Sequence, residues 1–153
     1  MIAYVDSSVL VRSYLQDEDG HDEAVALIGD PEVATVTGSL TRVEVSGALV
    51  RAARAGRSGR RSRGPDESRL LALLDGDLGK DGLVTVVTAP HDQVEAEALR
   101  ITRAHGLRAL DSWHLAVAKL TVPQLAEPGE PMAFASRDEG QLAAAVELGF
   151  KPL

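Results

Sequence analysis

The stretch "IAYVDSSVLV", Ile2–Val11, decides how the chain is expected to fold. Its first four residues form a short apolar run, which predicts a buried strand. From Asp6 to Leu15 the apolar side chains recur at helical spacing, which predicts a helix that starts directly after the strand. An aspartate therefore stands at the carboxyl end of the first strand, the edge of an α/β sheet at which ligands bind.

The same order of strand and helix repeats along the rest of the chain. Such alternation predicts an α/β fold, in which a parallel sheet is covered by helices on both faces. We see no internal repeat and expect one domain over residues 1–153. Two segments are predicted to be loops, the Arg-, Gly- and Ser-rich 57–65 and the proline-containing 121–131. The predicted strands are 2–5, 33–37, 83–87, 132–136 and 150–153, and the predicted helices are 6–15, 22–29, 39–55, 66–78, 91–106, 111–120 and 138–149.

The composition excludes several kinds of site. The 153 residues include no cysteine, so disulfides, zinc–thiolate sites, iron–sulfur clusters and thiol catalysis are excluded. Aromatic residues make up only 3% of the chain, which disfavours a base-stacking surface. The first residues show no signal-peptide pattern, and no apolar run approaches the roughly 20 residues of a membrane helix. We therefore expect a cytoplasmic protein with no membrane partner.

The net charge of −7 conceals one basic segment. Residues 51–63 hold six arginines and no acidic residue, and without these six the remaining ten basic residues face 23 acidic ones, a balance of −13. The acidic body argues weakly against general nucleic-acid binding. The basic segment has three interpretations: a phosphate-binding loop, a solvated disordered loop, or a docking site for an acidic partner. The six arginines are Arg51, Arg54, Arg57, Arg60, Arg61 and Arg63.

Four acidic residues stand where a metal or substrate site is expected. Asp6 and Asp138 follow predicted strands, and Asp111 begins the predicted helix "DSWHLAVAKL". Each aspartate also has a simpler explanation, because Asp is a favoured N-cap residue that stabilises a helix by about 1 kcal/mol relative to Ala. Glu44 lies in the middle of a predicted helix, among apolar neighbours, where no cap is needed. A carboxylate buried there needs a partner, either an arginine such as Arg42 or a bound metal or substrate.

An α/β sheet can bring these four acids into one cleft. Two like charges 4 Å apart repel by about 4 kcal/mol at an effective dielectric constant of 20. Four ionised carboxylates therefore require protonation or a cation among them. Oxygen donors without thiolates favour Mg²⁺ or Mn²⁺. Acidic clefts that hold such ions mainly serve phosphate chemistry.

Four blocks of the chain resemble the acidic motifs of PIN-domain nucleases. The blocks are "YVDSSVLV", "RVEVSGALVRAARAG", "LRALDSWHLAVA" and "FASRDEGQLAAAVELGF", in this order and over nearly the whole chain. Each block alone is a weak signal, but the ordered set is specific, and it is most similar to the VapC-type toxins of bacterial toxin–antitoxin pairs. The resemblance implies a three-layer α/β/α sandwich with a central parallel sheet. It also implies an endoribonuclease that depends on Mg²⁺ or Mn²⁺.

The resemblance assigns roles to individual residues and to partners. Asp6, Glu44, Asp111 and Asp138 match the four family acids and are expected to hold the metal and form the catalytic site. The implied partners are an RNA substrate, a second copy of the chain in a homodimer, and a small antitoxin protein. A segment of the antitoxin is expected in the cleft, where an arginine from it can pair with the carboxylates.

Several further residues are candidates for supporting roles. Ser7 follows the first acid, and Ser136 stands two residues before the fourth, where the family usually has Thr. Both hydroxyls are expected to orient a carboxylate or a phosphate. Arg12 and Arg42 are candidates for contacts with the RNA backbone.

The helix that carries the third acid adds two more candidates. His114 is interpreted either as a general base or as a histidine bonded within the helix packing, and Trp113 either as a core or subunit contact or as a base-stacking platform. The apolar residues Leu115, Ala116 and Ala118 are expected to pin this helix to the sheet.

Other functions fit the sequence less well. Acidic Mg²⁺ sites also occur in phosphatases and in phospho-acceptor receiver domains, which use an aspartate as nucleophile. Such a phosphatase has D-x-D after its first strand, where this chain has "DSS", and a receiver has Lys after a late strand, where this chain has Arg137. Two alternatives within the PIN class stay open: a nuclease of RNA maturation, and a catalytically silent module that binds RNA or a partner.

Overall fold

Strand β1 (Ile2–Val5) lies at the centre of the sheet, and all four of its residues are buried. The computed structural model describes residues 1–57 and 66–153. Its sheet has the strand order β3-β2-β1-β4-β5, and every neighbouring pair is parallel. The other strands are β2 (Ala34–Gly38), β3 (Thr85–Val87), β4 (Met132–Ala135) and β5 (Lys151–Pro152), so all five predicted strands are present.

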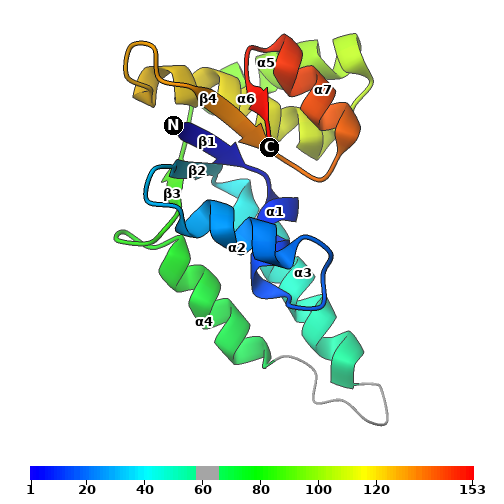
Figure 1. Cartoon of the computed structure of the whole chain (residues 1–153). Coiled ribbons are helices and arrows are strands. Elements are labelled where there is room, and N and C mark those ends of the chain that lie inside the picture. Colours follow the sequence, from blue (N-terminus) through cyan, green and yellow to red (C-terminus); the bar gives the residue numbers. More distant parts are fainter. Residues whose placement is uncertain (58–65) are drawn as a thin grey trace.

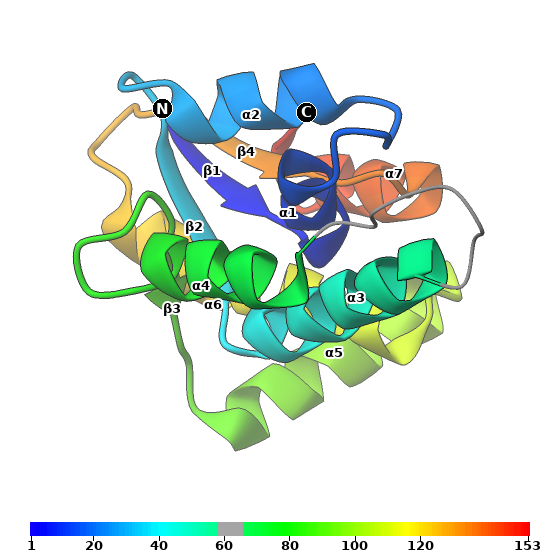
Figure 2. The ribbon, with the colours of Figure 1, turned by 90° about the horizontal axis from the view of Figure 1, so that it is seen from below.

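Helices cover both faces of the sheet, as Figure 1 shows. One layer contains α1 (Ser7–Tyr14), α2 (His21–Gly29), α3 (Leu40–Arg57) and α4 (Glu67–Asp77), and the other contains α5 (His91–His105), α6 (Ala109–Leu125) and α7 (Glu139–Glu147). Helices α3 and α4 lie side by side in the first layer (Figures 1 and 2). Over the described residues, no helix combines the length and the apolarity that crossing a membrane requires. The predicted α/β/α sandwich is confirmed.

Alternating side chains of β1 divide the core into two clusters. Ile2 and Tyr4 pack with α5, α6 and α7, whereas Val5 packs with α1 to α4. This alternation follows from the period of two residues in a strand. Leu115, Ala116 and Ala118 of α6 are fully buried, which confirms that they pack this helix against the core.

The strand order reverses direction at β1. The chain runs from β1 to β2 and β3 on one side and then crosses to β4 and β5 on the other. In open parallel sheets, a crevice forms at such a switch point, outside the carboxyl ends of the strands. The backbone N–H of Asp6 donates to the carbonyl of Ala135 at 3.0 Å, so the segments that follow β1 and β4 leave the sheet together. This edge is where the acidic residues meet.

The predicted bounds of two helices need correction. Helix α6 does not begin at Asp111 but two residues earlier, at Ala109, and it continues to Leu125 through the segment predicted as a loop. Pro123 lies in the last turn, where its missing N–H removes one hydrogen bond near the helix end, a smaller disturbance than in the middle of a helix. Helix α3 likewise extends past Gly56 to Arg57. The remainder of the predicted loop 57–65 lies outside the described residues.

Glu97 links α5 to α6, the helix that carries Asp111 and His114. Its carboxylate accepts from Lys119 Nζ at 2.7 Å and from Arg100 Nη2 at 2.6 Å, and its side chain is 12% exposed. Burial alone raises the pKa of Glu97, but the hydrogen bonds and charges of Arg100 and Lys119 outweigh it, and the net pKa is lowered from 4.5. A carboxyl whose folded pKa is depressed stabilises the fold above its unfolded pKa and loses that contribution as pH falls through the folded pKa.

We therefore expect Glu97→Gln to lower the free energy of unfolding at neutral pH by about 1 kcal/mol. The difference from wild type should shrink as the pH falls below 4.5. Urea denaturation across this pH range measures both. The control is Glu95→Gln, the same change at an exposed position of α5, which should cost about 0.5 kcal/mol or less. A Glu97→Gln effect independent of pH would refute this role.

Candidate active site

The structure places the four sequence-predicted acids at the carboxyl edge of the sheet. Asp6 follows β1, Asp138 precedes α7, Asp111 lies in the first turn of α6, and Glu44 projects from α3. The negative charges of Asp138 and Asp6 both act on Asp111. His114 lies against Asp6 and Glu44 together. Four segments far apart in sequence thus contribute to one acidic cluster.

Asp6 and Asp138 are N-caps and members of the cluster at the same time. Asp6 Oδ2 accepts from the N–H of Ser8 at 3.1 Å, while its Oδ1 lies 3.6 Å from His114 Nε2. Asp138 Oδ1 accepts from the N–H of Gln141 at 2.8 Å, while its Oδ2 lies 3.9 Å from Arg108 Nη2. One oxygen of each carboxylate is fixed by the helix, and the other faces the cluster. The capping explanation and the site explanation are therefore compatible.

Asp111 has a different local position from the one predicted. It is not the N-cap, because Arg108 occupies that position and the helix starts at Ala109. A carboxylate in the first turn is still favourable, since it faces the positive end of the helix dipole. Burial and the carboxylates of Asp138 and Asp6 raise the pKa of Asp111, and Arg108, whose Nε lies 3.6 Å from Oδ2, opposes this effect.

Glu44 is paired with a histidine and not with an arginine. His114 Nε2 lies 2.6 Å from Glu44 Oε2, and the Glu44 side chain is 22% exposed. The expected arginine partner, Arg42, instead donates to Asp75 at 2.6 Å and to the carbonyl of Leu78 at 2.8 Å. The apolar neighbours of Glu44 are not all buried, since Val43 is 71% exposed.

His114 is the centre of a buried hydrogen-bond chain. Its ring is 1% exposed, and its Nδ1 lies 2.8 Å from the Tyr4 hydroxyl. Because a carboxylate only accepts hydrogen bonds, Nε2 must carry the proton shared with Glu44. Burial lowers the pKa of His114, but the hydrogen bond to Glu44 and the charges of Asp6, Glu44 and Asp111 outweigh it, and the net pKa is raised. These contacts indicate that His114 positions Glu44 rather than touching a substrate.

Gly38, at the end of β2, leaves room for this chain. A Cβ at Gly38 would lie 2.7 Å from the Tyr4 hydroxyl oxygen, closer than real contacts allow. Neither Gly38 nor Tyr4 was predicted from the sequence as part of the site. The only signal for them is their position at the carboxyl ends of adjacent strands.

The two serines differ in their surroundings. Ser136 Oγ donates to Gln141 Oε1 at 2.5 Å and accepts from the N–H of Asp138 at 3.0 Å. Gln141 Nε2 in turn donates to the carbonyl of Asp111 at 3.1 Å. Ser136 thus ties the backbones of two acids together, in line with an orienting role. Ser7 lines a groove beside Glu44, and within the described part of the chain its hydroxyl makes no hydrogen bond.

The remaining candidates are Arg12, Arg42 and Trp113, and their contacts in the structure do not test the predicted roles. Among residues 1–57 and 66–153, the buried Nε of Arg12 has no hydrogen-bond partner, and its guanidinium lies over Gly20. An RNA contact by Arg12 or by Arg42 stays a prediction. Trp113 is half-buried against the core cluster of α5 to α7, with its ring 5.1 Å from that of His91, which favours the packing interpretation.

The donor chemistry of the cluster fits Mg²⁺ or Mn²⁺, since the four acids supply only carboxylate oxygens. The side chains as they lie do not form a metal cage: over residues 1–57 and 66–153, no group of three or more His, Asp or Glu is arranged to hold an ion. Two basic side chains of the protein lie between the acids instead. Arg108 lies between Asp111 and Asp138, and His114 lies between Asp6 and Glu44. The Arg108 side chain is 86% exposed, and a metal ion at Asp111 and Asp138 would compete with it for these carboxylates.

The fold and the site together define a parallel α/β protein with an acidic centre at the carboxyl edge of its sheet. The chain belongs to the PIN domain family: the family's model matches residues 3–122, more than half of the chain. Members of this family are generally metal-dependent nucleases, which places the protein in the nuclease class of hydrolases. The matched stretch contains Asp6, Glu44 and Asp111 and ends before Asp138. No curated protein matches the chain.

We expect Arg108→Gln to tighten Mn²⁺ binding about fivefold, because it removes a competing positive charge worth roughly 1 kcal/mol at an exposed position. Titration followed by the electron paramagnetic resonance signal of free Mn²⁺ measures the affinity. The matched control is Arg103→Gln, which removes the same charge from an exposed position on α5 and should leave the affinity unchanged. Unchanged or weaker binding in Arg108→Gln would contradict the competition.

Proposed function

We propose that the protein is an endoribonuclease that hydrolyses RNA phosphodiester bonds with the help of Mg²⁺ or Mn²⁺. The main support for this proposal is that Asp6 and Asp138 each have two roles, as a helix N-cap and as a member of the acidic cluster. Each gives one carboxylate oxygen to a helix cap and presents the other to the cluster that Glu44 and Asp111 complete. A purely structural cap has no reason to be placed beside three other acids, because their mutual repulsion is costly.

The residues of the chain then have distinct tasks. Asp6, Glu44, Asp111 and Asp138 are the residues that would hold the ion, and when bound the ion activates water and neutralises charge on the phosphate. His114 keeps Glu44 in place through the 2.6 Å hydrogen bond. Ser136 and Gln141 hold the Asp138 and Asp111 segments in register. Arg108, once displaced from the acids, is available to pair with a phosphate oxygen.

We also propose that the nuclease is the toxin of a toxin–antitoxin pair, active as a homodimer and inhibited by a small antitoxin protein. Support comes from the likeness of the four acidic blocks to VapC-type toxins. The position taken by Arg108 adds support, because it shows that a guanidinium fits between Asp111 and Asp138, where an antitoxin arginine is expected. A search for a neighbouring gene that encodes a small antitoxin would distinguish this role from a role in RNA maturation.

We expect Asp6→Asn and Asp111→Asn each to reduce metal-dependent cleavage of a mixed RNA substrate by about 100-fold or more. Asn keeps the shape of the side chain and its capping ability but removes the charge that a cation needs. Gel analysis of the RNA with Mg²⁺, with Mn²⁺ and with a chelator measures the loss. Cleavage that persists without metal would contradict the proposal.

The matched control for this experiment is Asp66→Asn. Asp66 caps α4 by accepting from the N–H groups of Ser68 and Arg69, so it has the same structural role as Asp6 but lies on a different helix. Its variant should cleave RNA at the wild-type rate. Equal losses in Asp66→Asn and Asp6→Asn would mean that the caps matter only for stability, and the assignment of Asp6 would be wrong.

A further inference from the structure

Two buried threonines join the end of β1 to the start of α3. Thr37 Oγ1 donates to the carbonyl of Val5 at 2.7 Å, and it also lies 2.7 Å from Thr41 Oγ1. Both threonines are 0% exposed. Because the one hydroxyl proton of Thr37 goes to Val5, Thr41 must be the donor in the second hydrogen bond. The two hydroxyls thus form a directed chain that runs from α3 through the end of β2 to β1.

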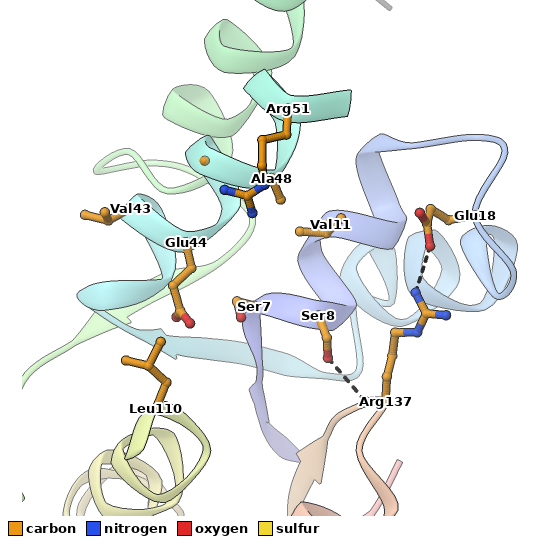
Figure 3. A pocket seen from close by; sticks show the side chains of 11 residues that line it. Ser7, Ser8, Val11, Glu18, Val43, Glu44, Ala48, Arg51, Leu110 and Arg137 are labelled. Atoms are coloured by element: carbon orange, nitrogen blue, oxygen red, sulfur yellow. Dashed lines mark hydrogen bonds and ion pairs between the residues drawn. The ribbon is translucent and has the colours of Figure 1, made fainter. Parts of the chain in front are cut away.

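Each end of this hydroxyl chain lies beside an acid of the cluster. Val5 directly precedes Asp6, and Thr41 precedes Glu44 by three residues, or about one turn of α3. Figure 3 shows the Glu44 side chain extending from α3 into the space between this helix and Ser7, the first residue of α1. A change in the angle at which α3 leaves the sheet would therefore move the Glu44 carboxylate relative to Asp6.

The hydroxyl chain acts where the pairing of β1 with β2 ends. The last paired residues of these strands are Tyr4 and Val36, so the Thr37 hydroxyl connects the strands one residue beyond their ladder. The turn that follows, between β2 and α3, begins with Gly38, which has no side chain to restrict the backbone. The hydrogen bond between Thr37 and Thr41 spans this turn and limits its freedom.

We propose that Thr37 and Thr41 are positioning residues of the acidic site, which hold α3 so that Glu44 stays beside Asp6 and His114. The inference rests on the proposed nuclease function, and it adds a second support for Glu44 to the one that His114 provides. The competing explanation is that the hydroxyls only stabilise the fold, as buried and paired polar groups commonly do. The location of the chain favours a role in the site, because it connects the segments that carry Asp6 and Glu44.

Thr35 provides a matched control on the same strand. It is 4% exposed, and its Oγ1 donates to the carbonyl of Leu83 at 2.8 Å. Thr35 and Thr37 lie two residues apart in β2, so both face the same side of the sheet. Leu83 precedes β3, at the opposite edge of the sheet from the acids. Replacing either threonine by valine thus removes the same kind of hydrogen bond, but only one of the two bonds lies at the site.

The first measurement needs neither metal nor RNA. A buried imidazole N–H that is bonded to a carboxylate gives a proton resonance downfield of the amides, and its loss in His114→Gln identifies the signal of Nε2. We expect Thr37→Val and Thr41→Val to shift this resonance upfield, because a displaced α3 weakens the 2.6 Å hydrogen bond between His114 and Glu44. Thr35→Val should leave the resonance in place.

The second measurement compares Mn²⁺ affinity and RNA cleavage. Thr37→Val and Thr41→Val should each bind Mn²⁺ about tenfold more weakly and lower kcat about tenfold, with KM for the RNA unchanged. Thr41→Ser restores the hydroxyl and should bring both values close to those of wild type. Urea denaturation should show a similar loss of stability for Thr37→Val and Thr35→Val, which excludes general destabilisation as the cause. If Thr37→Val does not fold, Thr41→Val provides the test, because it keeps the hydrogen bond between Thr37 and Val5.

The outcomes distinguish the failure of this inference from the failure of the proposed function. If Thr41→Val matches Thr35→Val in the His114 resonance, the Mn²⁺ affinity and kcat, the positioning role is overturned and the nuclease proposal stands. A loss that Thr41→Ser does not recover also overturns the positioning role. A wild-type protein that neither binds Mn²⁺ nor cleaves RNA would overturn the proposed function, whereas a shifted His114 resonance in Thr41→Val would still support the placement of Glu44 by the threonines.

Discussion

The hydrogen bond between His114 and Glu44 joins the two helical layers at the carboxyl edge of the sheet. His114 belongs to α6, on one face, and Glu44 belongs to α3, on the other. The Tyr4 hydroxyl from the central strand holds the second ring nitrogen, and Gly38 leaves the space that this hydroxyl needs. Without the imidazole, Glu44 would lose its 2.6 Å hydrogen bond to Nε2, and Asp6 would lose its 3.6 Å contact with the same atom. The geometry of the acidic cluster therefore depends on one buried ring.

The carboxylates of the cluster destabilise the fold through mutual repulsion, and contacts with other groups of the protein offset part of this cost. Carboxylates gathered at one edge repel one another, and the pKa of Asp111 is raised by its burial and further by the charges of Asp138 and Asp6. Two aspartates each give one oxygen to a helix cap, and the basic side chains of His114 and Arg108 lie against the acids. Of these two side chains, His114 is buried, whereas Arg108 is exposed. In the proposed function, a divalent ion would replace Arg108 as the positive charge beside Asp111 and Asp138.

Much of this arrangement could be predicted from local patterns in the sequence. The alternation of apolar runs predicted the parallel sheet, and the acids that follow strands predicted the edge at which the site lies. What local patterns could not predict are contacts between distant residues. Glu44 meets His114 across 70 positions and Tyr4 meets His114 across 110, so neither partner could be read from helical or strand spacing. Arg108 was overlooked for a different reason: the helix was expected to start at Asp111, which placed Arg108 outside it.

In the proposed mechanism, the carboxylates at this edge direct water to the phosphate, and His114 supports Glu44 rather than acting as an acid–base catalyst. The most direct test is the chemistry of the RNA ends after cleavage in water enriched in the heavy oxygen isotope. We predict metal-dependent products in which the new phosphate end is a monoester that carries one solvent oxygen from a single turnover. Products that end in a 2′,3′-cyclic phosphate, formed without metal and lost in His114→Gln, would show attack by the ribose hydroxyl under histidine catalysis. That result would contradict the proposed mechanism.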